Sequence, residues 1–258
     1  MVERAPATNH LIDGLTRNDR EKLLKNGETV ELAFGQILCE PRHALPYAYF
    51  PLAGFISLVT TLDGHQPLEI GLIGNEGMLG ATLILGLDAA PLRAVVHGPG
   101  TALRLRTAQF RRHFRASPLF LKMLQQYQYV LMAQMSTAAA CVHFHSVEAR
   151  LIRRLLMAHD RARSDQFHLT HEYLAGMLGV RRSGVTVAAG VLQRKMLIRY
   201  TRGEISILDR AGLEEACCEC YAATIRDYAR LLENGWQKGA NGGAPERVQS
   251  VRKRTVSV

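Results

Sequence analysis

The sequence has no long apolar run, since no stretch approaches the 18 consecutive apolar residues of a membrane span. The first residues, MVERAPATNHLIDG, also lack the apolar core of a secretory signal. Cysteine is scarce, with 5 in 258 residues at irregular spacings, so we expect reduced thiols and no structural disulfide. These absences predict a cytoplasmic protein with no membrane partner.

Enzyme signatures are missing as well. The chain has no G-x-S-x-G elbow, no Walker loop, no H-E-x-x-H pair and no dinucleotide fingerprint. Gly71, Gly74, Gly77 and Gly80 recur every three residues, which fits turns between strands better than a phosphate cradle. We therefore expect a protein that is not an enzyme, with no catalytic residues and no cofactor.

Two short segments raise the question of a metal site. ACCECY contains Cys217, Cys218 and Cys220, but on a helix these spacings point the three thiols in different directions. The histidines of HFH at 143–145 would likewise diverge on a helix. We expect structural cysteines, hinge histidines and no metal; metal ligation and redox sensing are the alternatives.

The net charge of +9 is unevenly distributed along the chain. Residues 148–203 hold 11 Lys and Arg against 4 Asp and Glu, whereas residues 1–147 hold 13 against 11. A positive surface of this kind suits phosphate binding, and a solvated helix face is the alternative. Charge alone does not decide between the two.

The first part of the chain has the pattern of a helix followed by β-structure. Residues 9–26 predict one helix that stops at Asn26-Gly27. From 28 to about 107, short β-rich runs alternate with Gly, Pro and Asp-Gly turns: ETVELAF, YAYFPL, FISLVTTL, PLEIGLIG, RAVVHG and TALRLR. This spacing indicates a sandwich or a small barrel. LDGHQ at 62–66 predicts a hairpin turn.

After Ser117-Pro118 the pattern becomes helical. Steps of three and four, as in a coiled coil, connect Leu121, Leu124, Gln128, Leu131, Met135, Ala138 and Val142. A helix of roughly 25 residues would extend about 37 Å, too long for a small barrel to cover. We expect a second copy of the chain to cover this seam; packing of the helix along its own domain is the alternative.

Residues 147–163, VEARLIRRLLMAHDRAR, predict a further amphipathic helix. Ser146 is its expected N-cap, and Glu148 lies near the positive end of the helix dipole. Its arginines, Arg150, Arg153 and Arg154, are expected to form an exposed, hydrated face. Contact of these arginines with phosphate is the alternative.

EYLAGMLGVRRSGVTVAAGVL at 172–192 reads either as one interrupted helix or as two. Thr170 is a natural N-cap for a helix from about His171 to Leu178. Gly179 suits a left-handed turn, and inside a continuous helix it would cost about 1 kcal/mol. The sequence therefore predicts two helices joined by a sharp turn. The second would start near Arg181 and bury Val185, Ala188 and Leu192.

The residues left exposed at the start of the second helix are Arg181, Arg182, Ser183 and Thr186. A recognition helix presents such side chains to base edges in the major groove, where arginine binds guanine through two hydrogen bonds. Downstream, MLIRYTRGEISILD at 196–209 predicts a β-hairpin wing that places Arg199 and Arg202 over the DNA backbone. This combination favours DNA binding over a purely structural helical hairpin.

From about residue 9 to 232, the sequence resembles the Crp/Fnr family of transcription regulators. The motifs that carry the resemblance are YFPLAGFISL (49–58), GNEGMLG (74–80), VEARLIRRLLMAHDR (147–161) and LTHEYLAGMLGVRRSGVTVAAGVLQRKMLIRYTRGEISILD (169–209). It implies an α+β fold with a jelly-roll-like β-roll sensor domain at 9–118, a dimerisation helix at 119–146 and a winged helix-turn-helix domain at 147–232. It also implies a homodimer formed through residues 119–142, a near-palindromic double-stranded DNA site, and contact with RNA polymerase.

Carried over by position, the resemblance places the main base-reading arginine at Arg182 and the next reader at Ser183. A further contact position falls on Val187, which cannot donate a hydrogen bond, so a different preferred DNA sequence is implied. Positions that approach phosphates in the family fall on Thr170, Arg181 and Gly184.

The sensor departs from the cyclic-nucleotide-binding members of the family. Ala81 stands where those relatives place a glutamate on the ribose, and Ala94 where a serine or threonine follows Arg93. A candidate effector pocket around Gly80, Ala81, Arg93 and Ala94 therefore lacks two of three polar contacts, and we do not expect tight binding of cyclic AMP. The effector is an unknown small molecule, and function without one stays open. The family's oxygen sensors hold an iron–sulfur cluster with N-terminal cysteines, whereas this N-terminal half has only Cys39.

The rival hypothesis is a ligand-binding signalling module whose C-terminal helices dock a protein partner. Salt dependence distinguishes this hypothesis from DNA binding, because the affinity for DNA through several phosphates falls steeply as the salt concentration rises. The Gly-rich and then basic tail at 233–258 is expected to be disordered.

Overall fold

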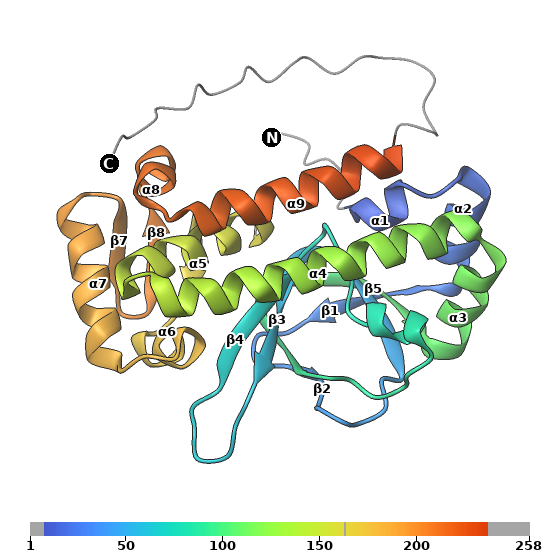
Figure 1. Cartoon of the computed structure of the whole chain (residues 1–258), viewed down its shortest axis with the longest axis horizontal. Coiled ribbons are helices and arrows are strands. Elements are labelled where there is room, and N and C mark those ends of the chain that lie inside the picture. The colour runs from blue at the N-terminus through green and yellow to red at the C-terminus, as the bar shows by residue number, and fades with distance from the viewer. Residues whose placement is uncertain (1–7, 163, 237–258) are drawn as a thin grey trace, which may run out of the picture.

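Two antiparallel sheets and the helices around them make up the fold in the computed structural model, which describes residues 8–162 and 164–236 (Figure 1). The larger sheet belongs to the N-terminal half and the smaller one to the C-terminal half. Across these residues, no helix combines the length and the apolar composition needed to cross a membrane.

The chain begins with two short helices, α1 (His10–Asp13) and α2 (Arg17–Asn26). The prediction of one helix over 9–26 is therefore wrong. α1 stops at Gly14, and a new helix starts because the Thr16 hydroxyl accepts a hydrogen bond from the backbone N–H of Asp19. The predicted stop after Asn26 is confirmed.

The β-roll contains β1 (Glu28–Leu32), β2 (Ile37–Cys39), β3 (Tyr47–Thr60), β4 (Leu68–Ile73) and β5 (Arg93–Arg106). The strand order is β1-β5-β3-β4, with β2 also paired to β5. Runs that the sequence predicted as separate strands join into two long ones, β3 and β5. Shifts in their pairing register, near Gly54 (φ 77°) among others, bend the strands without ending them. The predicted hairpin turn between β3 and β4 is confirmed, with Gly64 at φ 76°.

A long helix crosses the roll. After the 3-10 helix η1 (Ala81–Leu85) and α3 (Thr107–Ala116), α4 runs from Pro118 to Phe144, 27 residues. It begins where the sequence predicts, because the Ser117 hydroxyl accepts from the backbone N–H of Phe120 and Pro118 occupies the first turn.

The predicted coiled-coil seam of α4 faces its own chain. Leu124, Leu131 and Ala138 are buried without a second copy. The β-roll covers part of this surface, and the last helix, α9 (Glu219–Trp236), lies along α4 (Figure 1). The Gln134 side chain joins the layers, because its amide donates to Tyr228 Oη (2.7 Å) and to the Leu72 carbonyl (3.3 Å). The alternative of packing along the same chain thus holds for these residues.

The C-terminal domain starts with α5 (Val147–Ala162), which Ser146 caps as predicted. It continues with β6 (Gln166–His168), α6 (His171–Leu178), α7 (Arg182–Arg194), β7 (Ile198–Thr201), β8 (Glu204–Ile207) and α8 (Arg210–Ala216). The small sheet has the order β6-β8-β7, of which β6 was not predicted. α9 continues to Trp236, past the boundary expected at 232, and residues 237–258 of the predicted tail lie outside the described residues.

The arginines of α5 do not form an exposed face, so that prediction is wrong for Arg150 and Arg154, which are buried. Arg154 forms an ion pair with Glu69 of β4, and Arg161, two turns further, forms one with Glu76 (2.7 Å). Each carboxylate lies 85 residues from its arginine in the sequence. The two ion pairs therefore join the C-terminal domain to the β-roll.

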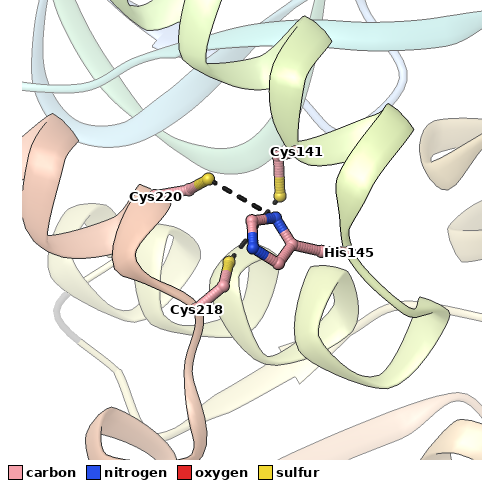
Figure 2. A group of neighbouring side chains, drawn as sticks. All are labelled: Cys141, His145, Cys218 and Cys220. Carbon is pink, nitrogen blue, oxygen red and sulfur yellow. Dashed lines mark hydrogen bonds between the residues drawn. The ribbon is translucent and has the colours of Figure 1, made fainter. Parts of the chain in front are cut away.

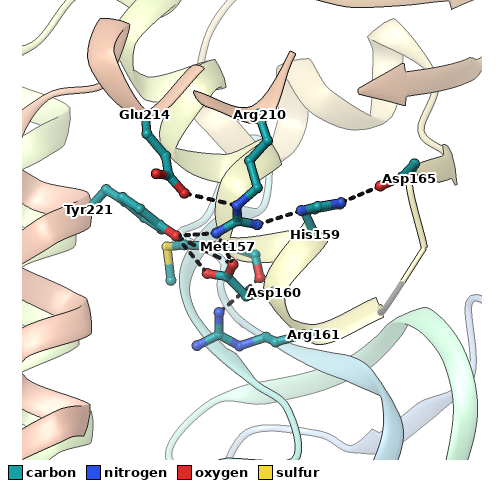
Figure 3. Close-up of polar contacts among 8 residues, drawn as sticks. All are labelled: Met157, His159, Asp160, Arg161, Asp165, Arg210, Glu214 and Tyr221. Atoms are coloured by element: carbon teal, nitrogen blue, oxygen red, sulfur yellow. Dashed lines mark hydrogen bonds and ion pairs between the residues drawn. The ribbon is translucent and has the colours of Figure 1, made fainter. Parts of the chain in front are cut away.

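A second polar network joins α5 to the last two helices (Figure 3). Arg210, at the start of α8, donates to Asp160 (2.7 Å), Glu214 (2.8 Å) and the Tyr221 hydroxyl (2.9 Å). The Tyr221 hydroxyl also donates to Asp160 (3.1 Å). One arginine therefore connects α5, α8 and α9.

Candidate nucleic-acid interface

The corner between α6 and α7 is a left-handed turn at Gly179, with φ 61° and ψ 42°. The N–H groups of Gly179 and Val180 donate to the carbonyls of Gly176 and Ala175, both at 3.0 Å, which satisfies the end of α6. Arg150 donates to the Leu178 carbonyl beside them. The prediction of two helices joined by a sharp turn is confirmed.

α7 packs on α5 and α6 through one face. Its buried residues are Val185, Ala188, Ala189 and Leu192, which include the three predicted from the sequence. The predicted reading residues Arg181, Arg182, Ser183 and Thr186 are all exposed. Figure 1 shows α7 at one end of the molecule, next to β7. The helix therefore has a free outer face.

The start of α7 suits a phosphate. Arg181 is the N-cap residue but makes no side-chain cap, so the first backbone N–H groups keep no side-chain acceptor there. A Cβ atom on Gly184 would meet nothing within 4 Å, which leaves room for a DNA backbone to approach. α7 contains no acidic residue to oppose the arginines.

Thr186 is exposed, yet its hydroxyl already has partners. It donates to the Arg182 carbonyl (3.1 Å) and lies 3.0 Å from Nδ1 of His171. Since a hydroxyl has one proton to give, Thr186 can offer a base edge only an oxygen lone pair. Arg182 and Ser183 keep their donors for DNA.

The predicted wing is confirmed as the β7–β8 hairpin, which turns at Arg202 (φ 51°) and Gly203 (φ 90°). Arg199 and Arg202 are both exposed on it. Thr170, the predicted N-cap of α6, is also exposed, and its Cγ2 would lie 3.4 Å from a Cβ atom on Gly203 of the wing. The wing and the reading helix thus present cations from two elements of one small domain.

His171 connects the wing to α7, a role that the sequence does not reveal. Its ring stacks on Tyr200 of the wing, with centroids 4.3 Å apart, and contacts Thr186 of α7. Burial, and then the charge of Arg182, lower the pKa of His171 below its ordinary value. A neutral His171 therefore holds these two elements in place without adding charge.

The candidate effector pocket agrees with the structure only in part. Gly80 and Ala81 line a cavity of about 250 Å³ between the β-roll and α4. Arg93 and Ala94 do not line it, because Arg93 pairs with Glu40 (2.8 Å) and Ala94 is buried in the sheet. The structure therefore brings two of the four predicted residues, Gly80 and Ala81, to this cavity.

Four side chains with metal-binding atoms meet where α4 ends and α9 begins: Cys141, His145, Cys218 and Cys220 (Figure 2). The expectation that the cysteines of ACCECY diverge is wrong for Cys218 and Cys220. Helical spacing does not apply to this pair, because Cys218 precedes the first residue of α9. The other two donors come from a segment more than 70 residues earlier.

Comparison with known proteins identifies the C-terminal domain. Residues 149–216 match the family model of the Crp-like helix-turn-helix domain. A search of curated proteins finds no match. The winged helix-turn-helix described above is therefore of the Crp type.

Solved structures share the architecture of about three quarters of this chain. A Crp/Fnr-family regulator from Eubacterium rectale is 18% identical with a TM-score of 0.58, covering 80% of this chain and 96% of that one. A c-di-GMP responsive global regulator from Xanthomonas campestris is 14% identical with a TM-score of 0.61, covering 75% and 100%. A Crp/Fnr-family regulator from Thermus thermophilus is 24% identical with a TM-score of 0.60, covering 73% and 97%.

At these identities the structural likeness establishes the fold: a β-roll, a long helix and a helix-turn-helix domain in the arrangement of Crp/Fnr regulators. The domain match adds a Crp-like DNA-binding module to that fold. The chain therefore carries a Crp-like helix-turn-helix domain within a fold of the Crp/Fnr arrangement.

Proposed function

We propose that this chain, a Crp-like helix-turn-helix domain joined to a Crp/Fnr-type β-roll, regulates transcription as a homodimer bound to a near-palindromic DNA site. The observation that carries the proposal is the free start of α7 beyond the corner at Gly179, with two exposed arginines and no acidic residue. That geometry lets a short helix enter a major groove.

Base recognition is assigned to Arg182 and Ser183, with Thr186 as an acceptor. Arg182 has the reach and the paired donors to bind O6 and N7 of a guanine. Contacts to the DNA backbone are assigned to residues at the start of α6, at the start of α7 and on the wing: Thr170, Arg181, Gly184, Arg199 and Arg202.

The dimer is assigned to the outer face of α4. Tyr129 and Met132 are 68% and 60% exposed there, and Ser136 and Ala139 continue the same stripe at helical spacing. This surface replaces the predicted seam within residues 119–142. A two-fold pair of α4 helices would place two recognition helices one DNA turn apart, roughly 34–36 Å. RNA polymerase is the expected further partner at a promoter.

An effector is assigned to the cavity between the roll and α4. Its walls are mostly apolar, with Gln128 and Thr82 as exceptions beside the Cys39 thiol. An apolar small molecule suits these walls better than a cyclic nucleotide, whose phosphate and ribose would stay unpaired. Because Gln128, Leu131 and Met135 come from α4, a ligand there would contact the helix that carries the dimer face. It would thereby shift the two recognition helices relative to each other.

The test begins with DNA fragments selected from genomic DNA by the full-length protein. Fluorescence anisotropy then compares a selected duplex with a random duplex for wild type, Arg182→Ala and Arg194→Ala. Arg182→Ala should lose about 1–3 kcal/mol of discrimination between the duplexes. Arg194→Ala is the matched control, since Arg194 is an exposed arginine at the far end of the same helix and should keep the wild-type discrimination.

Salt dependence separates this proposal from docking of a protein partner. Binding through several phosphates should weaken steeply between about 50 and 200 mM salt. The proposed function is contradicted if the protein selects no DNA fragment and its binding shows no dependence on salt concentration. If Arg182→Ala loses the same affinity for both duplexes, that result contradicts base reading by Arg182 but not the proposed function.

A further inference from the structure

The end of α4 and the start of α9 bring together four side chains that the DNA-binding proposal does not use. Cys141 lies in the last turn of α4 and His145 caps that helix, while Cys218 and Cys220 flank the first residue of α9. The ligand atoms of all four lie within 4.8 Å of one another (Figure 2). Cys141 and Cys220 are buried, and His145 and Cys218 are half-buried.

Two of the distances among these atoms match those expected around a single tetrahedral ion. Zinc binds cysteine sulfur at about 2.3 Å and histidine nitrogen at about 2.0–2.1 Å, so two tetrahedral ligands lie about 3.8 Å apart for two sulfurs and about 3.6 Å for sulfur and nitrogen. Sγ of Cys141 is 3.7 Å from Sγ of Cys218. Sγ of Cys220 is 3.6 Å from Nδ1 of His145. We propose that Cys141, His145, Cys218 and Cys220 bind one Zn²⁺ ion per chain.

The second nitrogen of His145 supports this assignment. Nε2 lies 3.2 Å from a carboxylate oxygen of Glu219, the residue between the two α9 cysteines. Metal-binding histidines characteristically donate their other ring N–H to a carboxylate, which fixes the tautomer and turns the free nitrogen toward the metal. Here that arrangement leaves Nδ1 facing the thiols.

The shape of the group favours one closed ion site over other cysteine chemistry. An iron–sulfur cluster spreads its ligands around two or four irons, whereas these four donor atoms all lie within 4.8 Å of one another. Three thiolates and one imidazole complete the tetrahedron and leave no position for a substrate, as in structural zinc sites.

The charge of the site is nearly balanced. Zn²⁺ with three thiolates and a neutral imidazole carries a net charge of about −1. Arg153 lies beside the site, because it lines the same small cavity as Cys141. An arginine in this position offsets the remaining negative charge.

The site lies at the junction of the two domains. His145 and Ser146 alone separate α4 from α5, the first helix of the DNA-binding domain. α9 follows the other end of that domain, so one ion would clamp the chain segments that enter and leave it. A consequence for regulation rests on the proposed function. The ion would hold the DNA-binding domain, and with it α7, in a fixed position relative to α4, the helix that carries the proposed dimer face.

The metal itself is tested on the full-length protein, purified in a phosphine reductant that does not bind zinc. Metal content is measured by mass spectrometry, and the metal-free protein is titrated with Co²⁺ and then Zn²⁺. One Zn²⁺ per chain, and one Co²⁺ with the absorption of tetrahedral thiolate ligation, are expected. Failure of the wild-type protein to bind either ion stoichiometrically at micromolar concentration overturns the proposal, as does a cluster-type visible absorption or a Cys141–Cys218 disulfide in the reduced, freshly purified protein.

Variants assign the ligands. Cys218→Ser should abolish the cobalt spectrum, whereas Cys217→Ser, a change at the adjacent cysteine outside the group of four, should keep it. Glu219→Gln keeps all four ligands and should weaken metal binding about 10–100-fold through His145. Circular dichroism checks that each variant is folded. An unchanged spectrum in folded Cys218→Ser, or equal losses in Cys217→Ser and Cys218→Ser, overturns the assignment.

The link to DNA is read separately. Wild-type protein bound to its selected duplex is compared before and after zinc removal, and a change of at least about tenfold in affinity is expected, which zinc should reverse. An unchanged affinity overturns the regulatory consequence and leaves the metal count as it stands. Metal binding without any DNA binding would instead count against the proposed function.

Discussion

The buried ion pair between Arg154 and Glu69 gives the sharpest test of how the two domains are joined. The side chains are 5% and 6% exposed, and Arg154 makes a second contact with the same carboxylate at 3.1 Å. Glu69 also accepts from the Ser57 hydroxyl. Glu69→Gln removes the negative charge but leaves the arginine buried, next to the Phe55 ring at 5.2 Å.

The expected cost follows from that burial. Removing one partner of a buried pair typically costs about 3–5 kcal/mol, because the remaining charge is neither hydrated nor paired. Replacing both partners by apolar side chains, as in Glu69→Leu with Arg154→Met, should recover most of the loss, since no charge is then stranded. The surface pair Arg93–Glu40, 38% and 34% exposed, provides the matched control: Glu40→Gln should cost at most about 1 kcal/mol.

The assay is urea unfolding followed by circular dichroism, with free energies extrapolated to water. The free energy of unfolding should fall strongly in Glu69→Gln, slightly in Glu40→Gln, and recover in the double variant. A loss in Glu69→Gln no larger than that in Glu40→Gln would refute the role of the buried ion pair. A double variant as unstable as the single one would show that the pair is needed for more than charge compensation.

Three further outcomes are expected. Burial, and then the charge of Arg154, lower the pKa of His97 from 6.5 to about 3. Between these two values the unfolded chain binds a proton that the folded chain does not. The free energy of unfolding should therefore fall as the pH is lowered from about 6.5 to 3, by up to about 1.4 kcal/mol per pH unit. His97→Gln should flatten that slope in urea titrations across the range, and an unchanged slope would contradict the assignment. Met132→Glu on the outer face of α4 should shift the protein from dimer to monomer in light scattering, while Leu62→Glu, an equally apolar exposed position in the β3–β4 turn, should not; a monomeric wild type would refute the dimer face. Calorimetry with cyclic AMP should show no tight binding, and a submicromolar dissociation constant would overturn that expectation.

Local features of the DNA-binding domain could be predicted from the sequence because their causes are local. Thr170 caps α6 through its own hydroxyl, and Gly179 takes a left-handed conformation that other residues avoid. In the wing, Gly203 provides the same backbone freedom at φ 90°, next to Arg202, which also takes a positive φ. Spacing of apolar residues then predicted which face of α7 is buried. Exposure of Arg181 and Arg182 follows from that pattern alone.

The length of α4 was predicted correctly, but its partner was not. The apolar seam specifies that something covers Leu124 and Leu131, and a periodic pattern does not say which surface does so. In the structure the β-roll and α9 cover it. The exposed stripe around Tyr129 and Met132 was hidden in the sequence because polar and small residues interrupt it.

The sequence by itself determined the local elements: where helices begin and end, where the chain turns, and which face of the reading helix is free. Only the tertiary structure decided which distant side chains meet. Arg154 was predicted to lie on a hydrated face, but folding places Glu69 beside it. The cysteines of ACCECY were predicted to diverge, but Cys218 and Cys220 meet Cys141 and His145. The physical reason is that capping and turn preferences act over a few residues, whereas ion pairs and metal sites depend on charges and donors that folding brings together from far along the chain.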